Sequence, residues 1–504
     1  MRGPLQKLKS YLFPTLLFLF SFLLYLSLIS KGPYHNDTLW LVIESENVIK
    51  THHLSYSFGP GYVLATILGA LSISLTKIFS LDDPVFAINL ISVVFGALCI
   101  PTTYGVVKKL LDSTAATFSS LLITIFPLFF GLSTYGKNHT PAVFFLLFTI
   151  FHLLSFLETK KRKNLIVAGV SLGLMGATRM QDAILILPAL CTLLTLGVRN
   201  NRKKISAKFK ACISLIAVAL ITALVLFLPL FFSEDKRTFY QLLSSFWASG
   251  VSENFRGIFS PSLFWCARYS WYQFLPMTTI LIVCGLIYLL KNSPRIFVFF
   301  GVWFLVPLAF YGNLHSIVPR FLMISFIPLL IAMGYILSLL FKYHVYLRAS
   351  AVMILATILS LWFLEITPIL YFRHQHALMP DFARWLSVVT PSDAEIISGD
   401  DGLFMDYYGK RKFRGRPSGV FEPIKVAELK DFKNNLDLAL EKGTAVYITS
   451  HGLFTYDPER IFSRFLDGHY QLTFIGAFPY EDWHRGETIL RIGRQALYKI
   501  DKKF

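Results

Sequence analysis

The chain is dominated by apolar runs that are long enough to cross a lipid bilayer. A transmembrane helix needs about 20 consecutive, mainly apolar residues, with a lower limit of roughly 17. Eight runs reach this length, near residues 11–30, 85–107, 115–133, 141–157, 211–232, 273–290, 320–340 and 349–370. Three shorter or interrupted runs lie near residues 165–178, 183–198 and 296–311. The sequence therefore predicts a polytopic α-helical membrane protein with about 11 transmembrane helices.

The basic residues predict which ends of these helices face the cytoplasm. Residues 1–370 hold 29 Lys and Arg but only 12 Asp and Glu, so they carry nearly all of the net charge of +18. Connections rich in Lys and Arg stay on the cytoplasmic side of membrane proteins. Such connections separate pairs of runs at 108–109, 160–163, 199–210, 291–295 and 342–348. We therefore expect loops that face anionic lipid, an amino terminus in the cytoplasm and no nucleic-acid partner.

One apolar stretch, Gly61–Phe79, does not fit as a crossing. If it crossed, every later basic cluster would lie outside the cytoplasm. Without it, 19 of the 29 basic residues are cytoplasmic, and only two acids, Asp112 and Glu158, lie with them. We therefore expect this stretch to form a helix in the outer leaflet, and the carboxy-terminal part of the chain to lie outside.

The last part of the chain, residues 371–504, predicts a small extracytoplasmic α/β domain. It holds 19 Lys and Arg and 18 Asp and Glu, which is the composition of a water-exposed domain. Strand-like pieces occur at 394–398, 445–448 and 488–492. A helix-like segment at 426–441 has apolar residues at helical spacing, namely Leu429, Phe432, Leu436 and Leu440. We place the domain boundary between a transmembrane part, 1–370, and this domain, 371–504.

The sequence lacks the motifs of several common classes of site. The five cysteines are isolated, without Cys-x-x-Cys spacing, so they indicate neither a disulfide framework nor a zinc site. Nucleotide-binding glycine motifs, the zincin motif and the nucleophile-elbow motif are also missing from the sequence. We therefore look for a site among polar residues that lie next to the predicted helices.

An acidic residue, Asp37, follows the first predicted helix directly on its outer side. It opens a helix-compatible stretch that also carries Glu44 and Glu46. Asp37 fits two interpretations, a helix N-cap or a catalytic acid or base. Glu44 is a candidate for acceptor binding or structural support.

A histidine, His139, lies at the next predicted outer connection, just before the run 141–157. Tyr135 and Lys137 share the same short turn. His139 is either a solvated residue without a function or a functional imidazole. A functional imidazole could act as a base, as a hydrogen-bond donor to phosphate or as a metal ligand. Lys137 is a candidate for phosphate binding and Tyr135 for structural support.

Two arginines mark further outer connections. Arg179 and Asp182 flank the turn between two apolar runs, where they form either an exposed ion pair or part of an anion clamp. Arg320 follows His315 and opens the run 320–340, either as a membrane anchor or as a second phosphate-binding residue. Asp182 and His315 are candidates for a supporting role.

Taken together, these residues place an acid, an imidazole and two guanidinium groups on one expected face of the membrane. Ionisable residues beside a membrane core are costly, so their collection on one face indicates a function. An acid can remove the proton of an attacking hydroxyl, while cations stabilise a departing phosphate. This set suits the attack of a hydroxyl group on a phosphate-linked sugar.

The order of these pieces over residues 20–340 resembles the C-type glycosyltransferase superfamily (GT-C). The resemblance is to the branch of protein O-mannosyltransferases and lipid A aminoarabinose transferases. Asp37 stands where that branch has an acid, and residues 57–62 stand where it has a Pro-containing, membrane-dipping stretch. The Gly-rich segment 165–178 before Arg179, and the sequence Arg320-Phe321-Leu322, are similar to two further family elements. The resemblance implies that Arg179 faces the phosphate of a lipid-linked sugar, and Arg320 is a further candidate for binding that phosphate.

The chain departs from that branch at His139, which stands in the place of a second acid. Two carboxylates would hold a hard divalent cation, whereas Asp37 with one imidazole makes a site for softer ions or none. A divalent cation therefore remains open as a cofactor.

The sequence as a whole predicts a membrane glycosyltransferase that moves a hexose or pentose from a polyprenyl phosphate to an extracytoplasmic lipid, glycan or protein. We expect it in the plasma membrane of a bacterium or archaeon, in cell-envelope glycosylation. One alternative is a transporter or flippase of a lipid-linked glycan, which predicts polar residues through the bilayer midplane and inverted halves. Another is a non-catalytic membrane protein that presents the carboxy-terminal domain.

Overall fold

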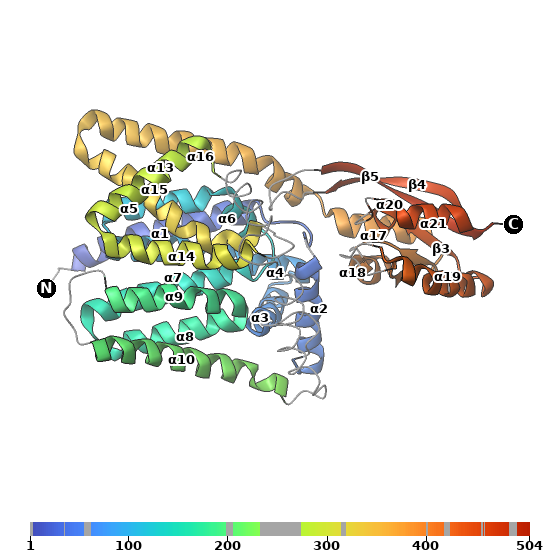
Figure 1. Cartoon of the computed structure of the whole chain (residues 1–504), viewed down its shortest axis with the longest axis horizontal. Coiled ribbons are helices and arrows are strands. Elements are labelled where there is room, and N and C mark those ends of the chain that lie inside the picture. The colour runs from blue at the N-terminus through green and yellow to red at the C-terminus, as the bar shows by residue number, and fades with distance from the viewer. Residues whose placement is uncertain are drawn as a thin grey trace. The chain divides into compact units, whose positions relative to one another are not determined.

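The chain folds into two units, a helical bundle and a smaller α/β domain (Figure 1). The structure is a computed structural model, and it describes all residues except 1–3, 35, 55–61, 198–204, 232–273, 314–318, 400–401, 418–423, 455–456, 458, 483–490 and 504. The first unit comprises Met1–Ile29 and Trp40–Tyr371. The second comprises Ser30–Leu39, Phe372–Arg485 and Ile489–Phe504.

The bundle is built from the predicted apolar runs. Its helices are α1 (Pro4–Ser27), α2 (Asn36–Thr51), α3 (Val63–Ile78), α4 (Pro84–Leu110), α5 (Ser113–Ile125), α6 (Pro127–Leu132), α7 (His139–Thr159), α8 (Arg162–Thr178), α9 (Met180–Leu196), α10 (Ile205–Phe231), α13 (Pro276–Asn292), α14 (Pro294–Tyr311), the 3₁₀ helix η2 (Pro319–Leu322), α15 (Met323–Tyr343) and α16 (Val345–Gln375). Each of the eleven predicted runs coincides with one of these helices, except that 115–133 is divided into α5 and α6. The prediction of a polytopic helical membrane protein is therefore confirmed.

Within the described residues, six helical segments are long and apolar enough to cross a membrane. They are Pro84–Leu110, His139–Thr159, Ser206–Leu230, Pro294–Tyr311, Pro319–Tyr343 and Val345–Val389. Five shorter apolar helices accompany them, at Leu12–Ser27, Val63–Ile78, Ser113–Ile125, Met180–Leu196 and Pro276–Asn292.

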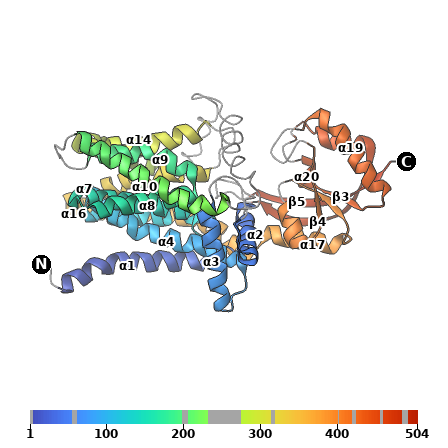
Figure 2. The ribbon, with the colours of Figure 1, turned by 90° about the horizontal axis from the view of Figure 1, so that it is seen from below.

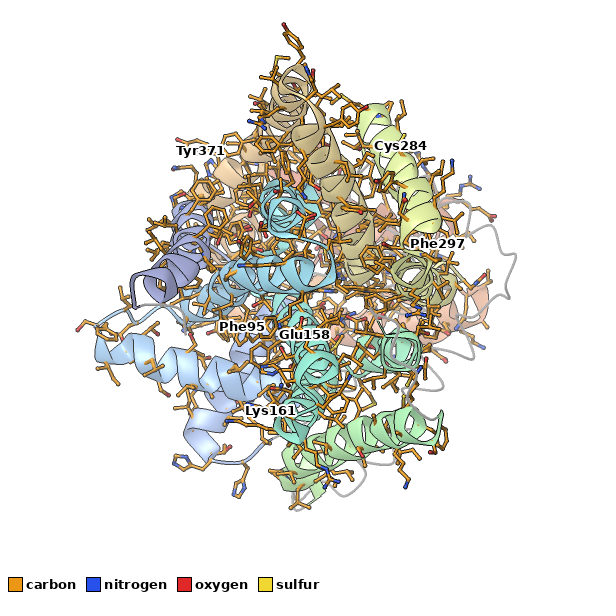
Figure 3. The ribbon with its side chains drawn as sticks, turned by 90° about the vertical axis from the view of Figure 1, so that its left-hand side faces the viewer. Phe95, Glu158, Lys161, Cys284, Phe297 and Tyr371 are labelled. Carbon is orange, nitrogen blue, oxygen red and sulfur yellow. The ribbon has the colours of Figure 1, made fainter. Side chains whose placement is uncertain are left out.

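The two acids that the sequence places with the basic loops are both paired with lysines. Lys109 Nζ lies 2.6 Å from a Glu158 carboxylate oxygen, and Lys342 Nζ lies 2.6 Å from an Asp112 carboxylate oxygen. These contacts join the ends of α4, α7 and α15 at one end of the bundle, which faces the viewer in Figure 3. Partly exposed pairs of this kind contribute little stability, so the surrounding loops keep their basic character.

Helices α2 and α3 lie crosswise at the other end of the bundle (Figures 1 and 2). The Ser45 hydroxyl on α2 donates to the Thr66 carbonyl of α3 over 3.3 Å, and the Ser72 hydroxyl on α3 donates to the Ala87 carbonyl of α4 over 2.7 Å. One side of α3 is buried, while Leu71, Leu75 and Ile78 are exposed. A crosswise helix with an exposed apolar side has the geometry expected of a segment that lies in the plane of a membrane surface.

Glycines let α8 approach α10 closely. A Cβ atom built on Gly169 would lie 2.7 Å from the Val218 side chain, and one on Gly173 would lie 2.5 Å from the Thr222 side chain. Small residues four apart are a common packing surface between membrane helices. These two glycines of the Gly-rich segment therefore serve the contact between α8 and α10.

The α/β domain is a five-stranded sheet with helices on both faces. Its strands are β1 (Glu395–Ile397), β2 (Lys412–Arg414), β3 (Val446–Thr449), β4 (Tyr470–Asp482) and β5 (Arg491–Lys502), in the order β2-β1-β3-β5-β4. The pairs β1–β2 and β1–β3 are parallel, while β3–β5 and β4–β5 are antiparallel. Its helical elements are α17 (Leu378–Val389), α18 (Gly402–Phe404), the π-helix η3 (Met405–Gly409), α19 (Val426–Glu441), α20 (Ser450–Phe454) and α21 (Ile461–His469).

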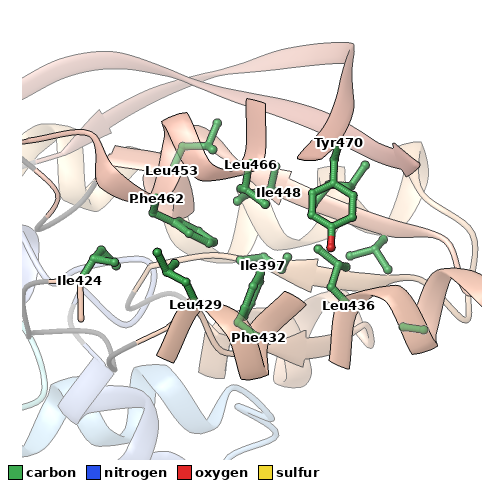
Figure 4. Close-up of a cluster of buried hydrophobic side chains, with 13 residues drawn as sticks. Ile397, Ile424, Leu429, Phe432, Leu436, Ile448, Leu453, Phe462, Leu466 and Tyr470 are labelled. Atoms are coloured by element: carbon green, nitrogen blue, oxygen red, sulfur yellow. The ribbon is translucent and has the colours of Figure 1, made fainter. Parts of the chain in front are cut away.

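Alternate residues of the strands face two separate cores. Ile397 and Ile448 pack with residues of α19 and α21, such as Leu436 (Figure 4). Their neighbours Ile396 and Tyr447 pack on the opposite face with residues of α17. This alternation follows from the two-residue period of a strand, and it explains why both faces of the sheet are covered.

The predicted elements of this domain were partly right. The helix at 426–441 coincides with α19, and the pieces at 394–398 and 445–448 contain β1 and β3. The piece at 488–492 overlaps the first two residues of β5, and residues 488–490 lie outside the described residues, while β4 has no counterpart among the predicted pieces. The β4–β5 ladder is long, and each strand is stabilised by pairing with the other. Sequence alone does not show this pairing.

Candidate functional site

A buried turn at residues 133–138 positions the predicted histidine. The Gly136 N–H donates to Asn89 Oδ1 over 2.6 Å, and the Lys137 N–H donates to Ser92 Oγ over 3.0 Å. The Ser92 hydroxyl donates in turn to the Lys137 carbonyl over 3.1 Å. A Cβ atom on Gly136 would lie 2.4 Å from the Ile88 side chain, so the turn can approach α4 only at a glycine. Two polar residues one turn apart on α4 thus hold the backbone just before His139.

Arg179 is the one residue between α8 and α9. Its backbone is extended, with φ −151° and ψ 92°, so it ends the first helix and precedes the second. Although it lies in a connection, Arg179 is only 3% exposed. The junction directs a guanidinium group into the protein.

The Arg179 guanidinium joins residues from three segments of the bundle. Its Nε donates to Asp182 Oδ2 over 2.7 Å, and its NH1 donates to Asn138 Oδ1 over 3.2 Å. NH1 also lies 3.3 Å from His139 Nε2. Asn138 is oriented by a second hydrogen bond, because its Nδ2 donates to the Thr178 carbonyl over 3.1 Å. The structure therefore brings together His139, Arg179 and Asp182, as the sequence predicted for a shared site.

Asp182 also binds the end of α14. The Tyr311 hydroxyl donates to Asp182 Oδ1, while the other carboxylate oxygen accepts from Arg179. The carboxylate is 2% exposed. The exposed ion pair considered for Arg179 and Asp182 is thus replaced by a buried one, in which both carboxylate oxygens have donors.

Phe321 connects this group to the second arginine. The Cζ atoms of Arg179 and Arg320 lie 5.5 Å and 5.4 Å from the centre of its ring. Tyr311 stacks on the same ring at 5.3 Å between centroids, and the His139 ring lies 6.2 Å away. Two guanidinium groups beside one aromatic ring form a cationic site with an apolar wall.

The remaining predicted residues lie in separate places. Lys137 and Tyr135 are buried in the turn before His139, and Glu44 is buried on α2. Asp37 lies in the first turn of α2 and belongs to Ser30–Leu39, the segment grouped with the α/β domain. His315 falls outside the described residues.

Three residues of the site were not predicted, namely Asn138, Tyr311 and Phe321. Asn138 adjoins His139, so its position was a usable signal. Tyr311 and Phe321 are aromatic residues at the ends of apolar helices, where aromatic residues are common in any membrane protein. Phe321 belongs to the sequence Arg320-Phe321-Leu322, which resembles a family element, whereas nothing in the sequence distinguishes Tyr311 from an ordinary interfacial residue.

The contacts of His139 bear on whether it could bind a metal ion. Within the described part of the chain, no group of three or more His, Cys, Asp or Glu side chains is placed to hold one. At His139 the Nε2 atom faces the positively charged Arg179 instead of an open position. A metal ligand needs a lone pair directed at the ion, and a neighbouring guanidinium repels the ion.

Comparisons with known proteins agree with the membrane fold. The family model described as dolichyl-phosphate-mannose-protein mannosyltransferase matches residues 67–230. A sequence comparison with curated proteins gives no match. Among solved structures, ArnT from Cupriavidus metallidurans bound to undecaprenyl phosphate is similar, with a TM-score of 0.62, 12% identity, and coverage of 97% of this chain and 98% of that chain.

Two further structures share the fold over part of their length. The archaeal oligosaccharyltransferase AglB from Archaeoglobus fulgidus, in complex with an inhibitory peptide and a dolichol-phosphate, has a TM-score of 0.54 and 15% identity, over 96% of this chain and 74% of that chain. The arabinofuranosyltransferase AftD from Mycobacteria has a TM-score of 0.55 and 13% identity, over 97% of this chain and 40% of that chain. The chain therefore shares its overall fold with these three proteins, and the family model that matches residues 67–230 agrees with the resemblance found in its sequence.

Proposed function

We propose that this protein transfers a sugar from a polyprenyl-phosphate donor to a hydroxyl-bearing lipid, glycan or protein on the extracytoplasmic side of the membrane. The observation that carries the proposal is the cationic site formed by Arg179 and Arg320 around Phe321. The similar fold of ArnT, whose structure contains undecaprenyl phosphate, supports the choice of donor. The dolichol-phosphate in the AglB structure supports it further.

The cationic site suits the phosphate of such a donor. Guanidinium groups remain charged at all physiological pH values, and their planar N–H groups match the oxygens of a phosphate. Arg179 is held from two sides by Asp182 and Asn138, so it is oriented before the donor binds. The buried Lys137 adds a third basic side chain in the turn beside this site.

The reaction breaks the bond between the sugar carbon and the phosphate oxygen. The acceptor oxygen forms the new bond to that carbon, and its proton passes to a carboxylate, which we assign to Asp37. The electrons of the broken bond stay on the polyprenyl phosphate, where the arginines stabilise the added charge. Asp37 and Glu44 are seven residues apart on α2, so they share a face of that helix, and Glu44 is proposed to support the acceptor.

The setting follows from the same proposal. The protein lies in the plasma membrane of a bacterium or archaeon. Its amino terminus and basic loops are cytoplasmic, and its α/β domain lies outside the cell membrane. The site residues would then lie on the side where a polyprenyl-linked sugar meets acceptors of the cell envelope.

The test uses membranes that contain the protein and a polyprenyl-phosphate sugar labelled in the sugar. We expect release of unlabelled polyprenyl phosphate together with transfer of the label to an endogenous acceptor. Asp37→Asn should lower the transfer rate by about 10²–10⁴, the usual contribution of a positioned base. The matched control is Asp83→Asn, because Asp83 caps α4 by accepting from the N–H groups of Val85 and Phe86, and Asn is an equally good N-cap.

Two results would contradict the proposal. Movement of the intact donor across the membrane, without release of polyprenyl phosphate, would support a flippase instead. Unchanged transfer by a folded Asp37→Asn variant would remove Asp37 from the reaction.

A further inference from the structure

We infer that His139 is a neutral hydrogen-bond acceptor that positions Arg179, and that it acts neither as a base nor as a metal ligand. The inference deepens the proposed function and rests on it, because it assigns the role of one residue within that site. The hydrogen atoms of the Arg179 guanidinium determine which atom of His139 can accept.

The NH1 nitrogen of Arg179 carries two hydrogen atoms, and each has a partner. One is donated to Asn138 Oδ1 over 3.2 Å, and NH1 lies 3.3 Å from His139 Nε2. The orientation of the Asn138 amide is set independently, since its Nδ2 donates to the Thr178 carbonyl. The second hydrogen of NH1 is therefore the one that faces His139.

A guanidinium group has no lone pair to accept a hydrogen bond. If Nε2 of His139 carried a proton, two donors and, in the imidazolium form, two positive charges would face each other in a buried site. His139 and Arg179 are each only 3% exposed, so water cannot relieve that repulsion. The contact is favourable only when His139 is neutral, with its proton on Nδ1 and the lone pair of Nε2 directed at Arg179.

Two further basic residues lie in the same part of the bundle as His139. The Arg320 guanidinium lies against the Phe321 ring that His139 also approaches. Lys137 is buried and lies two residues before His139. The Asp182 carboxylate on α9 accepts from Arg179 and Tyr311.

This arrangement gives His139 a positioning role. Asp182 holds Nε, and Asn138 with His139 holds NH1, so the guanidinium keeps one orientation toward the donor phosphate. The lone pair of Nε2 is used in this contact, which leaves it available neither to an acceptor proton nor to a metal ion. The place where the family pattern has a second acid is thus taken by a residue that orients a cation.

The test compares three substitutions at this position by steady-state kinetics with the polyprenyl-phosphate sugar. The carbonyl oxygen of Gln can take the place of Nε2, whereas the shorter Asn carries its carbonyl near the place of Nδ1. We expect His139→Gln to keep the KM for the donor within about threefold of the original. His139→Asn and His139→Ala should raise that KM by about ten- to a hundredfold, the value of a hydrogen bond to a charged group, with a smaller change in kcat.

The matched control is His152→Ala on the same helix. His152 contacts the rings of Phe148 and Phe151 and lies away from the site, so its replacement should leave the KM for the donor unchanged. Equal impairment by Gln, Asn and Ala at position 139 in folded protein would overturn the inference.

A second measurement does not depend on activity. In protein labelled with ¹⁵N-histidine, the signal lost in His139→Gln identifies His139 among the 12 histidines. We expect the spectrum of the neutral imidazole with its proton on Nδ1 at neutral pH. A charged ring, or a proton on Nε2, would overturn the inference even if transfer is observed. Absence of transfer by the original protein, with the expected tautomer present, would instead contradict the proposed function.

Discussion

At the scale of single residues, the main result is that His139 joins a pair of neighbouring candidates, Arg179 and Asp182, in one hydrogen-bonded group. His139 precedes Arg179 by 40 positions, and each residue alone also fits a structural interpretation. Burial removes the exposed ion pair considered for Arg179 and Asp182, because these residues are only 3% and 2% exposed. The roles within the group come from the geometry of its donors and acceptors.

We expect transfer activity to survive removal of divalent cations. The lone pair of His139 Nε2 faces Arg179, and a divalent cation placed there would be repelled by the guanidinium. The measurement is the transfer rate in membranes treated with a chelator, compared with the rate after magnesium or manganese is added. Loss of activity with the chelator and its recovery with either metal would show that a cation acts in the reaction.

At the scale of helices, close contacts through small residues decide how the bundle packs. Gly173 of α8 faces the Ala219 carbonyl and the Thr222 side chain of α10. Gly176 lies about one turn later on the same helix, and a Cβ atom there would have its nearest neighbour at 3.8 Å, which is an ordinary contact distance. A side chain therefore has no room at Gly173 but has room at Gly176.

We expect Gly173→Ala to destabilise the protein and Gly176→Ala to be tolerated. A Cβ atom on Gly173 would lie 2.6 Å from the Ala219 carbonyl oxygen, which is backbone and cannot move away easily. Overpacking of this kind costs about 1–3 kcal/mol. At Gly176 the methyl group has room, and Ala favours the helix. Thermal unfolding of the detergent-solubilised variants measures the difference, and equal midpoints would show that α8 and α10 can separate without cost.

At the scale of the whole molecule, the chain combines a helical membrane unit with an α/β unit. The α/β unit includes Ser30–Leu39, which precedes most of the bundle in sequence. Within this unit, the Lys31 N–H donates to the Arg373 carbonyl over 3.0 Å, and the Arg373 guanidinium lies 3.8 Å from the centre of the Tyr34 ring. The segment that carries Asp37 is thereby held by contacts between residues that are far apart in the sequence.

The orientation of the chain in the membrane can be tested with cysteines introduced into a variant that lacks the five native ones. A cysteine at Ser392, which is exposed in the α/β unit, should react with a membrane-impermeant thiol reagent in intact cells. A cysteine at Ser206, within the basic segment 199–210, should react only after the cells are permeabilised. The reverse pattern would invert the predicted topology.

The sequence by itself determined the class of fold and the approximate places of the helices. Length and hydrophobicity are enough for this, because a bilayer requires about 20 apolar residues for each crossing whatever the neighbouring helices are. Helical spacing likewise located α19 through Leu429, Phe432 and Leu436. The order of weak motifs was enough to indicate the superfamily.

Only the tertiary structure showed which candidate residues lie together. The direction of a side chain and the loss of its contact with water depend on segments far away in sequence, so the contact of Tyr311 with Asp182 could not be identified beforehand. The same holds for β4 and β5, whose strand conformation is stabilised by their mutual pairing. For His139 the sequence left three roles open: a base, a hydrogen-bond donor to phosphate and a metal ligand. The tertiary structure favours a fourth role, the acceptor of a hydrogen bond from Arg179, because a guanidinium group can only donate.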